Sequence, residues 1–190
     1  VTYVWNYSLP LIRANELDPL LPSLRIALSA LQKTDAEAMG ADAQLVRLAC
    51  AGASSLARAI EEASTTADGV KRVADAKDAA AAAALKEADA ACKWASELAG
   101  PRTALKRNVT AVWARTQAYL GAKDVNVGAE PEAGALGQLE LLASGLVDGD
   151  AARTAALGKA REALKGGGGG GGAGGGGARA ELCVRVAQQS

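Results

Sequence analysis

The sequence predicts an all-α protein, an elongated antiparallel helical bundle built on a long helical hairpin. Alanine is the most frequent residue, and it is the best helix former because it loses no side-chain entropy on ordering. No proline occurs between Ser23 and Ala99, so nothing over that length removes a helical N–H donor. With three Trp, three Tyr and no Phe, the core must consist of small residues between closely packed helices.

Residues 1–22 predict an extended N-terminal lead-in. The segment is short and holds three of the five prolines of the chain. Tyr3, Trp5 and Tyr7 alternate as side chains do along a strand. We expect this segment to pack against one end of the bundle.

Residues 23–165 are expected to form the bundle, and residues 34–99 its long hairpin. Apolar or small residues recur in steps of four and three, which is the heptad pattern of packed helices. Thr34 and Glu37 match a capping box and predict a helix start. The heptad stripe runs through Leu24, Leu28, Leu31, Leu45, Ala49, Gly52, Leu56, Ala59, Ala63, Val70, Val73, Ala80, Ala84, Ala91, Trp94 and Leu98.

A turn is predicted in the segment ASTTADGVK, residues 63–71. Its serine, threonines and aspartate favour turns, and Gly69 accepts the left-handed conformation. A reversal there leaves arms over 34–63 and 70–99, each about 45 Å long at 1.5 Å per residue. Equal arms suit an antiparallel hairpin. The alternative is one continuous helix over 34–99, which these turn-forming residues disfavour.

The second half of the bundle is expected to contain shorter helices. Gly100 ends one helix and Pro101 begins the next, at the first helical position. Further expected elements are a helix ending at Gly121, a loop over 122–134, a helix over 136–147, a turn over 148–150 and a short helix to Lys165. The apolar face of the first of these helices comprises Leu105, Val109, Val112, Thr116 and Leu120.

Residues 166–177 are glycine except for Ala173. A phosphate-binding loop requires a Lys-Ser or Lys-Thr pair after its last glycine, and that pair is missing here. The tract therefore predicts a flexible linker. The alternative is that glycine stands in for residues of unknown identity. The C-terminal segment, residues 178–190, fits either a helix or a strand.

The sequence predicts no catalytic, cofactor-binding or metal-binding residue. The chain lacks histidine, the usual general base and commonest metal ligand, and its three cysteines form no C-x-x-C pair. Lysine and arginine together number 21, as do aspartate and glutamate. The densest basic group, Arg102, Lys106 and Arg107, is too small for nucleic-acid binding.

Carboxylates are expected to be solvated, including Glu61 and Glu62. Asp35 and Asp42 are unusual because they fall on the heptad stripe. Either the stripe opens to solvent there or the first helix ends near Lys33.

Cys50 and Cys92 lie symmetrically about the predicted turn. In an antiparallel hairpin they come within about one helical turn of each other, so a disulfide between the arms is a candidate. Buried free thiols are the alternative. Trp94 and Trp113 are expected in the core rather than on a ligand-binding surface.

Two short motifs favour a cell-surface, extracellular location. Asn6 and Asn108 each begin an N-x-Ser/Thr acceptor site for N-glycosylation. The alternative location is cytoplasmic or organellar. No apolar run of about 18 residues occurs, so no membrane-spanning helix is expected.

The alanine-rich stretch DAAAAAALKEADAACKW, with the Ala-Asp-Ala and Ala-Glu-Ala repeats, resembles the surface-coat proteins of African trypanosomes. The resemblance covers residues 23–165. It is to the glutamic acid/alanine-rich proteins, which are related in fold to the N-terminal domain of variant surface glycoproteins. It implies an elongated bundle on the cell surface, attached to the membrane through a C-terminal lipid anchor outside this chain.

We therefore expect a non-enzymatic coat protein without cofactors and with possible self-association through its helix faces. One alternative is a helical surface receptor that binds its ligand at the bundle end, where Tyr3, Trp5 and the loop over 121–134 gather. The other is an intracellular coiled-coil scaffold subunit with reduced cysteines.

Overall fold

The computed structural model describes residues 2–14, 16–63, 79–122, 125–128, 131–166 and 182–184. Over these residues helices are the only regular elements, which confirms the all-α prediction. The elements are α1 (Thr2–Ala14), η1 (Asp18–Leu20), α2 (Leu21–Gln32), α3 (Ala36–Ala41), α4 (Ala43–Ala63), α5 (Ala79–Ala99), α6 (Thr103–Tyr119), α7 (Pro131–Ala143) and α8 (Asp150–Gly166).

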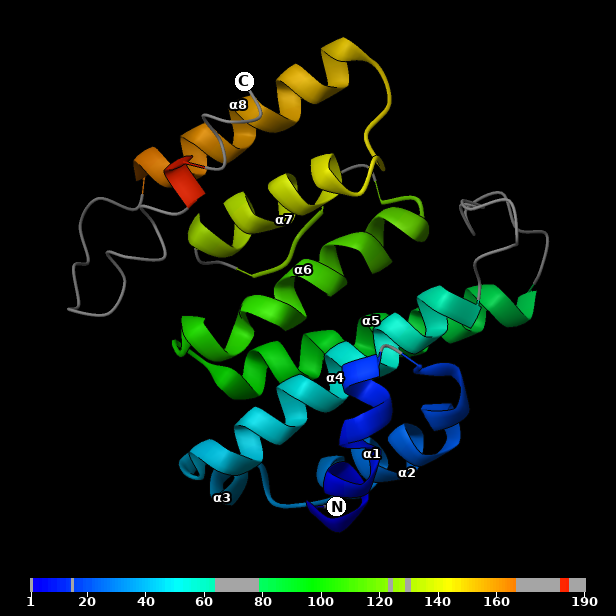
Figure 1. Ribbon diagram of the computed structural model, residues 1–190. Helices are drawn as coiled ribbons and strands as arrows, with labels where there is room; N and C mark the ends of the chain where they lie inside the picture. The colour runs from blue at the N-terminus through cyan, green and yellow to red at the C-terminus, as the bar shows by residue number, and fades with distance from the viewer. Residues whose placement is uncertain are drawn as a thin grey trace.

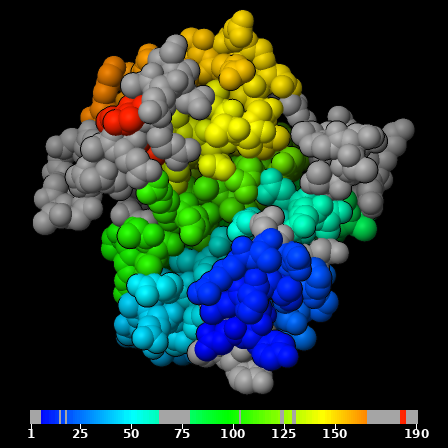
Figure 2. All heavy atoms as spheres, in the orientation of Figure 1, coloured from blue at the N-terminus to red at the C-terminus, as the bar shows by residue number. Residues whose placement is uncertain are grey.

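The helices pack in consecutive layers (Figure 1). α8 packs on α7, α7 on α6, and α6 on both α4 and α5. α2 and α3 pack against α4, and α1 contacts both α2 and α4. Figure 2 shows the result: α1, α2 and α3 form one end of the molecule, and α7 and α8 form the other.

The predicted hairpin is confirmed, because α4 and α5 pack antiparallel against each other. Its first arm begins at Ala43 instead of residue 34, and the described part of its second arm is α5. Apart from Ala63, the predicted turn over 63–71 lies outside the described residues.

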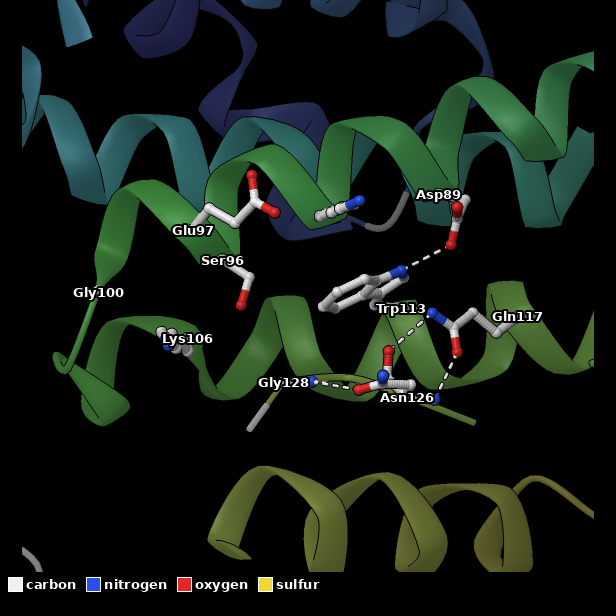
Figure 3. Close-up of a pocket in the computed structure, with 10 residues that line it drawn as sticks. Asp89, Ser96, Glu97, Gly100, Lys106, Trp113, Gln117, Asn126 and Gly128 are labelled. Carbon is white, nitrogen blue, oxygen red and sulfur yellow. Dashed lines mark hydrogen bonds between the residues drawn. The ribbon is translucent and has the colours of Figure 1, made fainter. Parts of the chain in front are cut away.

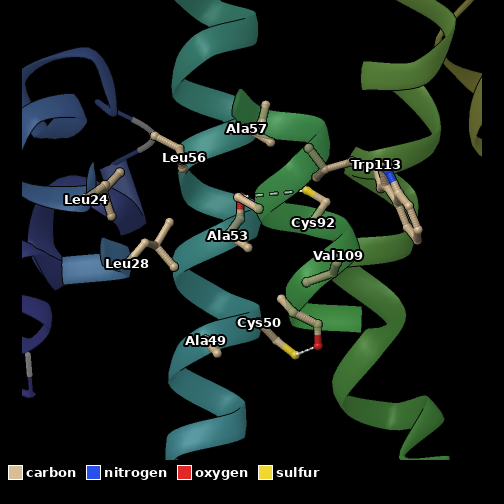
Figure 4. Packing of buried hydrophobic residues seen from close by; sticks show 14 of the residues in the cluster. Leu24, Leu28, Ala49, Cys50, Ala53, Leu56, Ala57, Cys92, Val109 and Trp113 are labelled. Atoms are coloured by element: carbon tan, nitrogen blue, oxygen red, sulfur yellow. Dashed lines mark hydrogen bonds between the residues drawn. The ribbon is translucent and has the colours of Figure 1, made fainter. Parts of the chain in front are cut away.

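Small residues bring α2, α4 and α5 close together (Figure 4). Gly52 of α4 faces Leu28 of α2, and a Cβ atom added at Gly52 would lie 3.1 Å from Leu28 Cδ2. The contact side of α5 is also small, and its buried residues are Leu85, Ala88, Ala91, Cys92, Ala95, Ser96 and Ala99. Small residues thus dominate the buried faces of α4 and α5, as predicted, but the rest of the core is built mainly on leucine and valine. Trp113 lies within the core with 7% exposure.

The extended lead-in predicted for residues 1–22 is wrong. Thr2–Ala14 is the helix α1, and Leu21 begins α2. Ser8, Leu11 and Ile12 share one face of α1, where Ser8 is buried and Leu11 and Ile12 pack on the core. Pro10 lies inside the helix but is exposed, so its ring does not disturb that packing.

The helix start predicted at Thr34 is displaced by one residue. Asp35 is the N-cap of α3 and accepts a hydrogen bond from the Ala38 N–H, whereas the Thr34 hydroxyl donates to the Ala30 carbonyl. Asp42 caps α4 in the same way, through the N–H groups of Gln44 and Leu45. The preceding helix ends at Gln32, so both aspartates on the stripe are caps between helices.

The break between α5 and α6 is close to the prediction. Gly100 ends α5 with a φ of +55°, a conformation that glycine adopts without a Cβ clash. Pro101 is not the first helical residue, because Arg102 is the N-cap and α6 begins at Thr103. Arg102 also donates to the Gly40 carbonyl at 2.8 Å and so connects this corner to α3.

The helix predicted over 136–147 begins and ends earlier. α7 starts at Pro131, where proline costs no hydrogen bond, and Gly145 with a φ of +68° follows its end. α8 extends to Gly166, and residues 167–177 of the glycine tract lie outside the described residues. Of the segment 178–190 only 182–184 are described, and they are helical. A second, smaller core joins α7, α8 and this segment: Ala135, Leu136, Leu139, Ala160, Leu164 and Leu182.

Candidate functional site

A cleft of about 610 Å³ opens between α5, α6 and the loop over 125–128 (Figure 3). We call it the α5–α6 cleft. Ligand sites in proteins commonly have volumes of roughly 300–1,000 Å³. Its lining residues are Asp89, Lys93, Ser96, Glu97, Gly100, Lys106, Trp113, Gln117, Asn126 and Gly128.

The indole of Trp113 lies across the α5–α6 cleft, between Asp89 and Glu97 along α5 (Figure 3). Its Nε1–H donates to Asp89 Oδ1 at 2.7 Å. Because the donor is on α6 and the acceptor on α5, this bond sets the orientation of the ring relative to both helices. The ring was expected in the core, and it is both buried and part of the cleft lining.

The loop over 125–128 forms one wall of the cleft, and the side-chain amide of Gln117 holds this loop in place. Gln117 Nε2 donates to the Asn126 carbonyl at 2.9 Å, and Gln117 Oε1 accepts from the Asn126 N–H at 2.8 Å. Asn126 Oδ1 in turn accepts from the Gly128 N–H at 3.4 Å. Gln117 thus pairs with the loop backbone as a neighbouring strand would.

The charges of the α5–α6 cleft come from two helices. Asp89, Lys93 and Glu97 follow one another at four-residue intervals on α5, so they share a face. Within the described part of the chain, neither the Lys93 ammonium nor the Glu97 carboxylate has a hydrogen-bond or ion-pair partner. Lys106 of α6 is buried, with 6% exposure.

A second ionic cluster joins three helices. Arg115 of α6 makes a two-pronged ion pair with Glu61 of α4, with Nε to Oε1 at 3.0 Å and Nη2 to Oε2 at 3.0 Å. Its Nη1 also donates to Glu140 of α7. The Tyr119 hydroxyl donates to Glu61 Oε1 at 2.9 Å. We call these four residues the Arg115 cluster.

The Arg115 cluster is mostly buried, since its three charged side chains retain 16–22% exposure. Burial by itself lowers the pKa of Arg115, but the hydrogen bonds and charges of Glu61 and Glu140 raise it above its ordinary value. The guanidinium is therefore permanently charged. Glu61 was expected on a solvated face; instead its carboxylate is a structural partner in the interior.

Cys50 and Cys92 are free thiols, so the candidate disulfide is not formed. Cys50 Sγ lies 3.7 Å from the Ala95 carbonyl oxygen, and Cys92 Sγ lies 3.9 Å from that of Ala53 (Figure 4). Each thiol thus faces the opposite helix three residues from the other cysteine. The two cysteines come within one helical turn of each other, as expected. Their sulfur atoms nevertheless face backbone carbonyl groups at different heights along the two helices.

Burial suppresses the reactivity of both thiols. It raises the pKa of Cys50 to about 11, against a small lowering by Lys106. It raises the pKa of Cys92 to about 12, helped by the charge of Asp89 and the neighbouring Cys50. The thiolate is the reactive form, so neither group suits nucleophilic chemistry near neutral pH. Cys183 is exposed.

Both predicted glycosylation asparagines have exposed side chains. Asn6 lies on α1 and Asn108 on α6, whereas Ser8 and Thr110 of the same motifs are buried. Tyr7 is 79% exposed, and the side chains of Tyr3 and Trp5 lie outside the described residues. The expected gathering of Tyr3 and Trp5 at the bundle end therefore lies outside the described residues.

Among the described residues, no three cysteine, aspartate or glutamate side chains come close enough to hold a metal ion. None of the described helices is long and apolar enough to cross a membrane. A second cavity, of about 340 Å³, lies between α6, α7 and α8 and is lined mainly by alanine, leucine and valine.

Sequence reasoning missed most of the residues that organise these sites. Gln117, Asn126, Arg115 and Glu140 gave no local signal, because their partners lie on other elements, between 9 and 54 residues away in the chain. The alternation of Asp89, Lys93 and Glu97 along one helix face was a usable signal for the cleft.

Comparisons with protein-family models, with characterised proteins and with solved structures find no match to this chain.

Proposed function

We propose that the chain is a non-enzymatic structural protein of the cell surface, a helical bundle that acts as part of a protective coat. The observation that supports this proposal is that the buried ionisable groups of the chain connect helices to one another. The Arg115 cluster joins α4, α6 and α7, and the two buried thiols sit in the α4–α5 interface. These groups strengthen contacts between helices, as a mechanical scaffold requires.

Exposure of the two acceptor asparagines supports the surface location. Asn6 and Asn108 project from helices α1 and α6, so a glycan on either would extend into solvent without disturbing the core. Glycans at such positions add bulk and hydration to an outer surface. Attachment to the membrane would come from a lipid anchor outside this chain, and the exposed helix faces would allow neighbouring copies to associate.

The proposal is tested by the intact mass of native protein before and after enzymatic removal of N-glycans. We expect the mass to fall on deglycosylation and each of the Asn6→Gln and Asn108→Gln variants to lose one glycan. Asn126→Gln, which alters an asparagine outside any acceptor motif, is the matched control and should leave the glycan mass unchanged. A native mass equal to that of the bare polypeptide would contradict the surface assignment.

A second candidate, an intracellular scaffold subunit, is favoured by the free thiols of Cys50 and Cys92. Reduced, buried cysteines are typical of proteins in the reducing cytosol. This alternative predicts no glycan, three alkylatable thiols after unfolding without reductant, and a solution mass above that of the monomer. The same mass measurements therefore distinguish the two candidates.

A further inference from the structure

In the α5–α6 cleft, two charges of opposite sign beside an aromatic ring have no partner among the described residues. The Lys93 ammonium and the Glu97 carboxylate lie one helical turn apart on the same face of α5, with Cβ atoms about 5–6 Å apart at this spacing. Both line the cleft together with the buried indole of Trp113. Helix surfaces normally pair such charges with each other.

The local sequence explains why these charges stay apart. A lysine placed four residues before a glutamate is the weaker order for an ion pair on a helix. Asp89 precedes Lys93 in the stronger order, but Asp89 Oδ1 accepts the hydrogen bond from Trp113 Nε1. The cleft therefore presents a cation and an anion that are both available to a ligand.

We propose that the α5–α6 cleft binds a free α-amino acid with an aromatic or large apolar side chain. The ligand carboxylate pairs with Lys93, its ammonium pairs with Glu97, and its side chain packs on the Trp113 indole. A free amino acid fits because its two charges are separated by one carbon atom, which matches two protein charges one turn apart. A residue inside a peptide has lost both charges and does not fit.

The remaining lining residues suit this ligand. Gln117 holds the Asn126 loop at the edge of the cleft through two hydrogen bonds, so the wall exists before the ligand arrives. The volume of about 610 Å³ accommodates a phenylalanine-sized molecule with water around its charged end. The indole offers the stacked or edge-to-face contact that aromatic rings adopt.

The test follows the indole N–H resonances of ¹⁵N-labelled protein by NMR while L-phenylalanine is added. A Trp113→Phe variant assigns the Trp113 resonance. We expect phenylalanine to shift this resonance in a saturable way and to leave the Trp94 resonance unchanged, which shows that the fold is retained. No saturable shift up to millimolar phenylalanine would overturn the proposal.

Two analogues of phenylalanine, each lacking one of its charged groups, test the two ion pairs one at a time. 3-Phenylpropanoate lacks the ammonium and 2-phenylethylamine lacks the carboxylate, and each should bind at least about tenfold more weakly than phenylalanine. Equal binding of all three would indicate stacking on the indole alone and would overturn the assignment of a zwitterion.

Variants of the two charged residues complete the test. Lys93→Gln and Glu97→Gln should each weaken phenylalanine binding about tenfold. Lys93→Gln should leave the affinity for 2-phenylethylamine unchanged, because that analogue has no carboxylate. Lys86→Gln, an exposed lysine on α5 that does not line the cleft, is the matched control and should bind as the unaltered protein does. Unchanged affinity in both cleft variants would contradict the proposal.

Discussion

The Arg115 cluster shows how one side chain can organise an interior that is otherwise apolar. Alanine and glycine pack closely but offer no directional contacts. Arg115 supplies them, because its planar guanidinium reaches Glu61 on one neighbouring helix and Glu140 on another. The cluster therefore specifies how α4, α6 and α7 are placed relative to one another.

Replacing the cation of this cluster should destabilise the protein. We expect Arg115→Met to lower the free energy of unfolding by about 2–4 kcal/mol, because two mostly buried carboxylates lose their partner. Urea denaturation measures the change. The control is Lys165→Met, which removes the exposed pair with Glu162, both 73% exposed, and should cost at most about 0.5 kcal/mol. Equal effects in the two variants would show that the Arg115 cluster contributes no more than a surface pair.

The two buried thiols predict a loss of stability in alkaline solution. Their pKa values rise from 9.0 when unfolded to about 11 and about 12 when folded, so the unfolded chain loses its protons first. The stabilisation is complete below pH 9 and declines as the pH rises toward 11, by up to about 1.4 kcal/mol per pH unit for each thiol.

The measurement is urea denaturation at pH 8 to 10.5, comparing the protein with a Cys50→Ala/Cys92→Ala double variant. The double variant should show a weaker decline with pH, whereas Cys183→Ala, which alters the exposed thiol, should decline as the unaltered protein does. Parallel curves for all three proteins would mean that the buried thiols titrate normally.

For single residues, the sequence showed which side chains are unusual at their positions better than it showed which side chains pair with each other. Asp35 and Asp42 were recognised as unusual on an apolar stripe, and capping explains both. Glu61 was placed in solvent because its partner Arg115 lies 54 residues away in the chain. Such pairs depend on which helices become neighbours, and local periodicity carries no information about that.

Helix α7 shows at the element scale how one missing Cβ atom allows close packing. A Cβ atom added at Gly137 would lie 2.9 Å from Val127 Cγ2 and 3.5 Å from Ala114 Cβ. Val127 is almost completely buried, so it cannot move aside easily. Gly134, one turn earlier on the same helix, has nothing within 4 Å of such an atom.

These two glycines give a matched pair of substitutions. Gly137→Ala should destabilise the protein by roughly 1–3 kcal/mol, because the added methyl group overpacks the contact between α7, α6 and the loop. Gly134→Ala should be neutral or stabilise by up to about 1 kcal/mol, since alanine is the better helix former. Thermal and urea denaturation measure both. If Gly137→Ala stabilised the protein, the loop at Val127 would have to shift away from the added methyl group at little energetic cost.

The sequence predicted elements well where one face was apolar over several turns. The hairpin of α4 and α5 and the apolar face of α6 were predicted on this basis. α1 was missed because the alternation of three aromatic residues outweighed Ser8, Leu11 and Ile12, the helical set that contacts the core. The predicted start of α7 is too late because the loop-forming residues around Pro131 obscure the helix start, although proline is favoured at the first helical position.

The described residues of the molecule form two cores of unequal size. The larger contains mainly buried residues of α2, α4, α5 and α6, and the smaller joins α7, α8 and the segment 182–184 through six buried residues. A small core buries less apolar surface, so it should open at a lower cost than the large one.

Hydrogen exchange measured by mass spectrometry should reveal this hierarchy. Leu164→Ala, in the smaller core, should accelerate exchange in α8 and leave α4 and α5 protected. Leu56→Ala, in the larger core, should accelerate exchange throughout the chain, since loss of a buried leucine costs roughly 2–5 kcal/mol. Uniform acceleration in Leu164→Ala would show that the molecule opens as one cooperative unit.

The interface between α4 and α5 has a thermal consequence. Alanine, serine and cysteine greatly outnumber leucine, valine and isoleucine among the buried residues of these two helices, so they bury backbone and methyl groups where leucine would bury longer chains. Unfolding exposes less apolar surface to water, and the heat capacity of unfolding should fall below the usual value of about 12–15 cal/mol/K per residue. A low heat capacity flattens the curve of stability against temperature, so this protein should keep nearly constant stability between cold and warm surroundings.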